Sequence, residues 1–279
     1  MISNNPLKQY FRQPAIYVRL PSGGQHYPPN SLDMPPNGEL PVYPMTAMDE
    51  ITYRTPDALF NGSAVISVIQ SCVPNIRDAW AVPSTDIDSL LVAIRIASYG
   101  QSMDVDTTCP ACATTNSYGV NLTAMLDQMT GGDYNQALQH GDLEINFRPM
   151  SYHNLNQNNQ SQFEQQRIMQ SMPADDANNT EQLTAIGDAL KKITEITVRS
   201  LSQSIASVRT PQALVTEPEY IQDMLQNCDR KLFNEIRDHV IRLKTQAELK
   251  PLKMRCPDCS NEYEQPITLD MTNFFGDAS

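Results

Sequence analysis

Long hydrophobic runs are missing from this 279-residue chain. Its most apolar stretch, residues 63–73, is shorter than the roughly 20 apolar residues that a membrane-spanning helix needs, and it contains Gln70. The first residues, MISNNPLKQYF, have no apolar core behind a basic start, so we expect no secretory leader. Membrane-spanning and leader-directed secreted proteins are therefore not the expected classes.

The motifs of common enzymes are missing as well. The sequence has no GxSxG nucleophile turn, no P-loop, no HExxH metal motif and no GxGxxG fingerprint. Its four histidines stand in unrelated contexts, and we expect His239 on the surface of a helix. The paired acids Asp86 and Asp88 fit the start of a helix, and Asp175 with Asp176 fits a solvated linker. We therefore predict no catalytic residue and no enzymatic activity.

Basic residues are outnumbered. The chain has 20 Lys and Arg against 32 Asp and Glu, which gives a net charge of -12. Because affinity for phosphate backbones comes mainly from Lys and Arg, this is a poor composition for a general nucleic-acid binder. One segment, residues 230–255, is locally basic. It is either the solvated face of a helix in an acidic protein or a contact surface for an acidic partner.

Prolines crowd residues 1–45. Proline lacks the backbone donor that helix interiors and sheet ladders use, so we predict a proline-rich extended arm. Two short strands fit between the prolines, at residues 15–20 and 39–43, with a turn at residues 22–24. Such an arm either wraps its own domain or reaches a neighbouring subunit.

Residues 46–150 predict a helical half followed by strands. Residues 46–49 resemble a capping box, and the Thr-Pro-Asp sequence at 55–57 is typical of a helix start. A further helix over 85–100 would bury one apolar face, formed by Ile87, Leu90, Leu91, Ile94 and Ala97. Alternation of apolar and polar residues predicts strands on both sides of the first cysteine pair and at 143–147.

Residues 151–250 predict a block of helices. The Asn- and Gln-rich run at 154–166 is either a polar helix or a mobile loop. A long helix is predicted over about 180–207, with two apolar stripes made of Leu183, Ile186, Leu190 and Ile193 and of Val198, Leu201, Ile205 and Val208. A second capping box is predicted at 216–219. The last helix should bury Phe233, Ile236, Val240 and Leu243.

Four of the six cysteines form two matched pairs, Cys109-Pro-Ala-Cys112 and Cys256-Pro-Asp-Cys259. A CxxC turn presents two thiolates to one ion, and two such turns complete a tetrahedral shell of four sulfurs. The residues that follow also match, as shown by Tyr118 with Tyr263 and by Leu122 with Leu269. The sequence predicts one structural Zn²⁺ per chain, in a closed site with no open catalytic position.

Other chemistries for these cysteines are a disulfide or redox pair and an iron–sulfur cluster. A thioredoxin-like pair would need an electropositive helix N-terminus, whereas here two matched pairs each lead into a strand. The separation is unusual, because residues 113–255 lie between the pairs and an ordinary zinc ribbon has roughly fifteen to twenty residues there. Cys72 and Cys228 have no partner motif and are expected to be buried thiols.

Together these features predict an α+β fold. Its centre is a small zinc-ribbon-like β element with a four-cysteine site, split by a large helical insertion and joined to a helical N-terminal half and the extended arm. The predicted domains are the arm at 1–45, a helical and zinc-ribbon core at 46–150 and 251–279, and an inserted helical block at 151–250.

Three long stretches resemble the baseplate hub proteins of contractile-tailed, T-even-like bacteriophages. They are FRQPAIYVRLPSGGQHY (11–27), ELPVYPMTAMDEITYRTPDALFNGSAVISVIQSCVPNI (39–76) and VPSTDIDSLLVAIRIASYG (82–100). The two CPxC knuckles fit the same family's pattern. The resemblance covers residues 10–125 well and the second knuckle more loosely, and it does not extend to the helical block.

The resemblance implies a non-enzymatic protein of tail assembly. Such a protein is either a structural part of the baseplate hub or a factor that helps the hub assemble and then leaves. Expected partners are other baseplate and tail proteins, with no nucleic acid, membrane segment or small-molecule substrate. The expected location is the host cytoplasm during assembly and, for a retained protein, the tail baseplate of the virion. The alternative is a zinc-ribbon nucleic-acid-binding or transcription-type adaptor using residues 230–255, which the acidic total disfavours.

Overall fold

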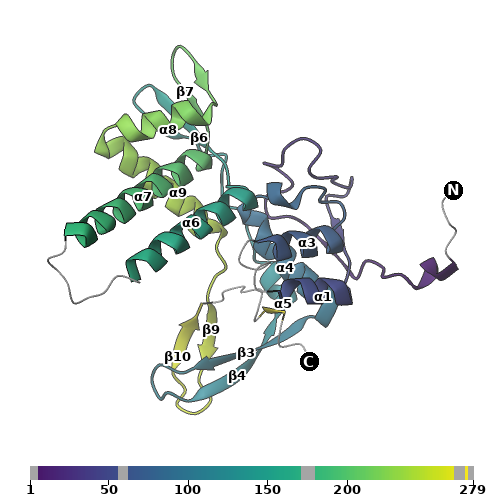
Figure 1. The fold of residues 1–279 in the computed structure, drawn as a ribbon. Coiled ribbons are helices and arrows are strands. Elements are labelled where there is room, and N and C mark those ends of the chain that lie inside the picture. Colours follow the sequence, from purple (N-terminus) through teal and green to yellow (C-terminus); the bar gives the residue numbers. More distant parts are fainter. Residues whose placement is uncertain (1–5, 56–61, 171–179, 267–273, 276–279) are drawn as a thin grey trace. The chain divides into compact units, whose positions relative to one another are not determined.

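The computed structural model describes residues 6–55, 62–170, 180–266 and 274–275, with the side chains of 168–170 and 180–186 excepted. The chain divides into two compact units (Figure 1). Unit 1 comprises residues 1–79, 85–131 and 248–279, and unit 2 comprises residues 80–84 and 132–247. In the sequence, most of unit 2 therefore lies between two parts of unit 1. Residues 132–150, which the sequence grouped with the first core segment, cluster with unit 2.

Unit 1 combines helices with three two-stranded antiparallel sheets, β1–β2, β3–β4 and β9–β10. Its helices are η1 (Pro6–Tyr10), α1 (Ala47–Tyr53), α3 (Ser63–Cys72), α4 (Ser84–Tyr99, from Thr85) and α5 (Leu122–Leu126). Its strands are β1 (Ile16–Val18), β2 (Leu40–Val42), β3 (Ser102–Thr108), β4 (Thr115–Asn121), β9 (Leu252–Arg255) and β10 (Glu262–Gln265). The short η2 (Ala79–Ala81) crosses the first sequence boundary between the units.

The proline-rich N-terminal segment folds onto unit 1 from Arg12 onward. The two predicted strands are present as β1 and β2, which pair with each other and bury Leu40 and Val42 completely. The Arg12 guanidinium donates hydrogen bonds of 2.6 Å to the carbonyl oxygens of Pro44 and Ser71. Of the two possibilities that the sequence left open for this arm, the described residues 12–45 follow the first and wrap their own unit.

Two of the predicted helices of unit 1, α1 and α4, begin within one residue of their predicted starts. The Thr46 side chain accepts a hydrogen bond from the Asp49 N–H, and the Asp49 carboxylate accepts one from the Thr46 N–H, which confirms the first capping box. α4 begins and ends within one residue of the prediction, and its predicted apolar face is buried except for Ala97, which is half-buried. The predicted helix start at 55–57 falls largely outside the described residues.

One residue near the C-terminus closes this part of the core. Phe275 is almost completely buried, and its carbonyl oxygen accepts a 2.7 Å hydrogen bond from the hydroxyl of Tyr53. The neighbouring Phe274 carbonyl accepts a hydrogen bond from the buried Arg95 guanidinium. Residues from opposite ends of the sequence therefore share one core in unit 1.

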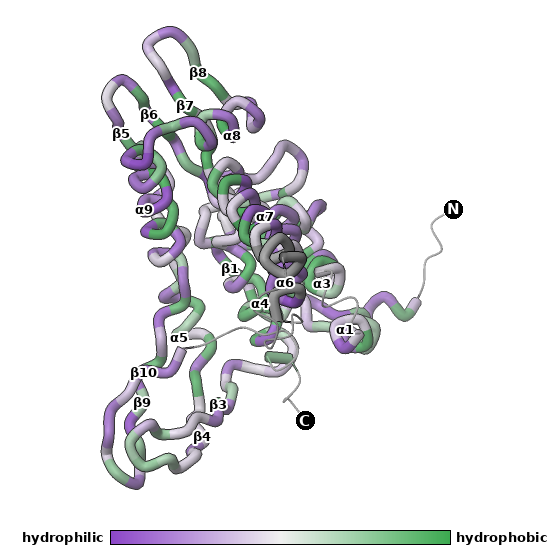
Figure 2. The backbone as a smooth tube through the Cα atoms, turned by 60° about the vertical axis from the view of Figure 1, so that its left-hand side comes forward, coloured by the Kyte–Doolittle hydropathy of each residue, from purple (hydrophilic) through white to green (hydrophobic). Residues whose placement is uncertain are grey.

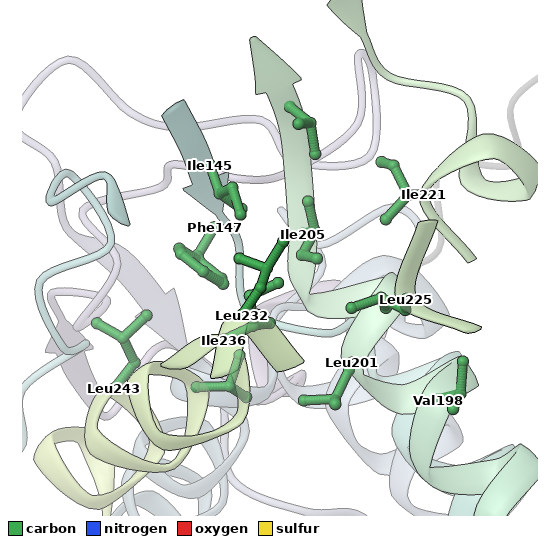
Figure 3. Packing of buried hydrophobic residues seen from close by; sticks show 12 residues of the cluster. Ile145, Phe147, Val198, Leu201, Ile205, Ile221, Leu225, Leu232, Ile236 and Leu243 are labelled. Carbon is green, nitrogen blue, oxygen red and sulfur yellow. The ribbon is translucent and has the colours of Figure 1, made fainter. Parts of the chain in front are cut away.

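Unit 2 packs helices against a four-stranded antiparallel sheet of order β5-β6-β7-β8. The strands are β5 (Leu138–His140), β6 (Leu143–Phe147), β7 (Ile205–Arg209) and β8 (Leu214–Val215). The helices are α6 (Tyr152–Gln170), α7 (Thr180–Ser204), α8 (Pro218–Asn227) and α9 (Arg230–Ala247). Figure 3 shows the apolar side chains of β6, β7, α7, α8 and α9 pointing toward one another around Ile205 and Ile236, both fully buried.

The structure corrects several expectations for unit 2. The long helix ends at Ser204 because the β-branched residues Ile205 and Val208 enter β7, where pairing with β6 satisfies the backbone. The predicted capping box at 216–219 is wrong, since the N-cap of α8 is Glu217 and its side chain makes no cap hydrogen bond. The Asn- and Gln-rich run is helical, within α6. Leu183 and Ile186 have no described side chains.

α9 is amphipathic, as Figure 2 shows by the change between green and purple along its turns. It buries Ile236, Val240 and Leu243 as predicted, whereas Phe233, also predicted to be buried, is half-buried. His239 is not on the helix surface: it is buried and stacks on Phe147 with ring centroids 4.4 Å apart. Among the described residues, no helix is both long and apolar enough to cross a membrane.

Candidate metal centre

The first cysteine pair forms the tip of the β3–β4 hairpin. The seven residues of β3 pair in continuous register with the seven of β4, and the turn between them holds Cys109 and Cys112. The Cys109 N–H donates to the Thr114 carbonyl oxygen at 2.9 Å, and the Ala113 N–H donates to the Cys109 carbonyl oxygen at 2.9 Å. Ala113 has φ of 59°, the left-handed conformation that lets so tight a turn close.

The second pair repeats this geometry at the tip of the β9–β10 hairpin. The Cys256 N–H donates to the Asn261 carbonyl oxygen at 2.9 Å, and the Ser260 N–H donates to the Cys256 carbonyl oxygen at 2.9 Å. Ser260 has φ of 60°. The two CPxC segments are therefore two copies of one turn, as their matched sequences predict.

The two turns bring all four predicted ligand residues together. The sulfur atoms of Cys109, Cys112, Cys256 and Cys259 all lie within 4.8 Å of one another. Across the two hairpins, Sγ of Cys109 is 3.7 Å from Sγ of Cys259, and Sγ of Cys112 is 3.6 Å from Sγ of Cys256. A tetrahedron with Zn–S bonds of about 2.3 Å has edges of about 3.8 Å, so these separations fit four sulfurs around one zinc ion.

The electrostatics of the cluster favour a cation. Sγ of Cys112 lies 3.4 Å from the Thr114 hydroxyl, and hydrogen bonds with Thr114 lower the pKa of Cys112 to about 6. The Asn261 N–H lowers the pKa of Cys259, but the neighbouring sulfurs outweigh it and raise this pKa to about 12. Four sulfurs this close cannot all carry negative charge without a compensating positive ion.

Two asparagines that the sequence analysis did not identify contact the cluster. The Asn116 side-chain amide donates to Sγ of Cys256 at 3.7 Å, and that of Asn261 donates to Sγ of Cys109 at 3.9 Å. Each asparagine lies on one hairpin and reaches a sulfur of the other. Their nearness in sequence to a CPxC pair was the one available signal, because a neutral donor beside a thiolate is a recurrent outer-shell arrangement.

The two hairpins meet through side chains. The Thr107 hydroxyl donates to Oε1 of Gln265 at 2.6 Å, and the Tyr118 hydroxyl donates to the Arg255 carbonyl oxygen at 3.2 Å. The tyrosines matched in the sequence are in contact, since the Tyr263 hydroxyl donates to that of Tyr118 at 3.4 Å.

The strands of the two hairpins do not form one common sheet in the described residues. Each CPxC turn reverses its own chain, so β3 pairs with β4 and β9 pairs with β10. Leu122 starts α5, and Leu269 lies outside the described residues. Cys72 is buried, as expected, and burial raises its pKa to about 12, whereas Cys228 is half-buried.

Chemically, the cluster suits a structural role. Four protein sulfurs would fill the tetrahedral shell of one metal ion, and a structural site differs from a catalytic one in leaving no position for water or substrate. Cys109 and Cys256 are buried while Cys112 and Cys259 are exposed, so the site lies at the surface of unit 1. The histidines do not join it, since His140 pairs with Glu235 at 2.6 Å in unit 2.

Comparison with known proteins gives one family. Neither the curated proteins nor the solved structures contain a match to the chain. A family model described as T4 bacteriophage base plate protein matches residues 20–276. The match includes both cysteine pairs and most of both units. Because it spans nearly the whole chain, the protein belongs to the T4 bacteriophage base plate protein family.

Proposed function

We propose that this baseplate protein acts in the hub region of the contractile tail, as a structural component or as an assembly factor, with one zinc ion bound by Cys109, Cys112, Cys256 and Cys259. As a baseplate component it interacts with other phage tail proteins. The resemblance of residues 11–27, 39–76 and 82–100 to hub proteins supports the hub assignment.

The single observation that carries the zinc proposal is the distance set of the four sulfurs. Two hairpins from distant parts of the chain place their four sulfurs within 4.8 Å of one another. The two Sγ–Sγ distances across the hairpins, 3.7 and 3.6 Å, match the edge of a zinc–sulfur tetrahedron. The bound metal would supply a cross-link between β3–β4 and β9–β10. Because metal ligands come together only in the folded chain, binding adds directly to the free energy of unfolding.

A role through protein contacts, with no chemistry of its own, agrees with the described residues. The buried histidine His239 stacks on Phe147. Nδ1 of His239 lies 2.6 Å from Nη2 of Arg242. The buried carboxylate of Asp86 accepts hydrogen bonds from Ser22 and thereby fixes the N-terminal segment. Each of these groups makes a structural contact within its own unit.

The nucleic-acid alternative gains little from the structure. In α9, Arg237 pairs with Asp238 at 2.8 Å and Lys231 lies 4.0 Å from Glu235, so part of the basic segment is neutralised by its own acids. The remaining positive charge is set against a total of -12. Phosphate binding depends on uncompensated Lys and Arg. The pairing within α9 therefore favours the interpretation of residues 230–255 as the solvated face of a helix.

The test combines genetics with composition analysis. A phage lacking the gene should accumulate incomplete tails, and supplying the wild-type protein or a Cys228→Ser control should restore infectious particles. Cys256→Ser should fail to restore them at the same expression level. Mass spectrometry of purified virions then separates a retained component from a factor that leaves. Normal tails in the deletion mutant would refute the proposed function.

A further inference from the structure

A groove of about 760 Å³ lies in unit 1 beside the two hairpins. It is bounded by β4, α5, residues 248–251 and β9. Much of its lining is apolar and comes from Tyr118, Val120, Met125, Met129, Leu252 and Met254. Methionine side chains are flexible and polarizable, so a wall rich in them can adapt to different apolar groups.

One side of the groove is a strand edge with unused backbone groups. In the β3–β4 hairpin the Cys109 N–H donates to Thr114, and at the other end the Leu122 N–H donates to Gln101. In an antiparallel pair the residues that bond across the ladder alternate, so these two bonds fix the pattern of the whole hairpin. Gly119 belongs to the other set, and its N–H and C=O point away from β3. Among the described strands, none pairs with this edge of β4.

The same reasoning applies to β9. The Cys256 N–H donates to Asn261 across the β9–β10 ladder, so the N–H and C=O groups of Lys253 and Arg255 point away from β10. The bond that the Arg255 carbonyl accepts from the Tyr118 hydroxyl agrees with this direction. The groove is therefore lined by residues of two strands, β4 and β9, that each have an edge without a neighbouring strand in the described chain.

Gly119 indicates what kind of group approaches. A Cβ atom at this position would meet Oδ1 of Asp104 at 3.7 Å, an ordinary contact, and the residue does not have the positive φ that favours glycine. Glycine inside a strand is destabilising, and it commonly marks a place where another backbone comes close. Since the described structure itself does not require glycine here, an approaching strand gives a physical reason for it.

The charges around the groove limit the occupant further. Lys250 and Lys253 are balanced by Glu248 and Glu264, so the lining carries no net charge. A strongly acidic or strongly basic segment would meet as much repulsion as attraction. An uncharged segment with apolar side chains avoids this cost and gains from burial against the methionines.

We propose that this groove receives an extended segment of another baseplate protein, which adds as a strand to the free edge of β4. Backbone hydrogen bonds at Gly119 would provide affinity, and apolar side chains at alternate positions would enter the groove and provide specificity. The inference rests on the proposed function, because that function supplies the partner from the same particle.

The test uses the full-length protein and an array of short overlapping peptides that cover the other tail proteins of the phage. Gly119→Pro removes the edge N–H, Gly119→Ala retains it, and Asp106→Pro removes an N–H from the opposite edge of the same hairpin. We expect Gly119→Pro to weaken peptide binding by about tenfold or more, the value of one backbone hydrogen bond left unmade. Asp106→Pro should bind within about twofold of wild type, because it leaves the free edge of β4 unchanged. Gly119→Ala keeps the edge N–H but adds a Cβ where the partner backbone approaches, so it should weaken binding less than Gly119→Pro does.

A second measurement does not depend on the proline variant folding. In the wild-type protein, bound peptide should slow hydrogen exchange at the Gly119 amide and leave the Asp106 amide unchanged. Three results would each overturn the proposal. The bound peptides could have apolar residues at helical spacing, Asp106→Pro could weaken peptide binding as much as Gly119→Pro, or the groove could bind the chain's own N-terminal peptide instead. If purified virions contain the protein but no peptide of the array binds it, the proposed docking of a strand in the groove is rejected, whereas the proposed baseplate function stands.

Discussion

Sγ of Cys112 lies 3.6 Å from Sγ of Cys256, although 144 positions separate the two residues in the chain. Most of that separation is unit 2, which has its own sheet and its own core. A metal ion at this point would close a very long loop, and closing long loops is where a cross-link removes the most entropy from the unfolded chain. The cluster thus connects the folding of the two hairpins across the whole insertion.

The metal prediction follows directly. Protein purified under reducing conditions without chelator should contain one zinc ion per chain by elemental analysis. Cys112→Ser should lose the metal and on the order of 4 kcal/mol in the free energy of unfolding, as expected when a structural metal is lost. Cys228→Ser is the matched control, since this half-buried thiol lies in unit 2 and outside the cluster. Iron in place of zinc, or no metal in the wild type, would contradict the assignment.

The asparagines beside the sulfurs give a finer prediction. Asn116→Ala and Asn261→Ala should each leave the fold intact but weaken zinc retention by about 10- to 100-fold, the usual effect of losing an outer-shell donor. Competition with a chromophoric chelator measures this. Ser117→Ala is the control, because Ser117 neighbours Asn116 in β4 but is exposed on the other face of the strand. If all three variants retained zinc equally, the contacts of 3.7 and 3.9 Å would have no energetic role.

The sequence predicted the meeting of the four cysteines better than it predicted the strands around them. Four cysteines in two matched turns leave few arrangements, so their meeting could be predicted without knowing the chain path. Strand partners could not be read in this way, because alternation shows which face of a strand is buried and not which strand lies beside it. The separate hairpins, joined by side chains such as Thr107 and Gln265, therefore had no sequence signal.

Helix ends and buried polar groups show the same limit. The apolar stripe that ends in Ile205 and Val208 fits helix spacing and is buried, yet tertiary pairing with β6 turns these residues into a strand. His239 sits among charged residues in the sequence, which favoured a surface position. Its burial depends on stacking against Phe147 from a distant strand, a contact that local sequence does not reveal.

Because the N-terminal segment packs on unit 1 from Arg12 onward, its removal should affect folding in a way that removal of a detached arm would not. Removing residues 1–11 should leave unit 1 folded, because the described part of that stretch has no buried residue. Removing residues 1–45 should unfold unit 1, since it deletes β1 and β2 together with the completely buried Leu40 and Val42. Leu40→Ala alone should cost about 2–5 kcal/mol, the range for buried leucines. Circular dichroism and urea unfolding measure both effects, and a folded protein lacking residues 1–45 would refute this account.

Asp86 makes stability depend on pH. Its carboxylate is fully buried at the start of α4 and accepts hydrogen bonds from the Ser22 N–H at 2.8 Å, the Ser22 hydroxyl at 2.5 Å and the Tyr27 hydroxyl at 3.0 Å. Burial raises the pKa of Asp86 above its usual value, and the hydrogen bonds from Ser22 and Tyr27 only partly offset that rise. The folded state therefore holds the proton more tightly than the unfolded state.

The sign of the effect follows from this difference. Asp86 contributes to the free energy of unfolding through its more tightly held proton. This contribution is fully present below the pKa of about 3.9 in the unfolded chain, and it is lost as pH rises through the higher pKa of the folded state. Asp86→Asn removes this dependence, so the free energy of unfolding of the variant should rise relative to wild type between about pH 4 and neutral pH. Urea unfolding at a series of pH values measures the difference, with Asp104→Asn, an exposed position on β3, as the control. The difference in free energy of unfolding between Asp86→Asn and wild type could instead stay constant across this pH range, or the Asp104→Asn control could show the same change with pH. Either result would show that Asp86 does not hold its proton more tightly in the folded protein.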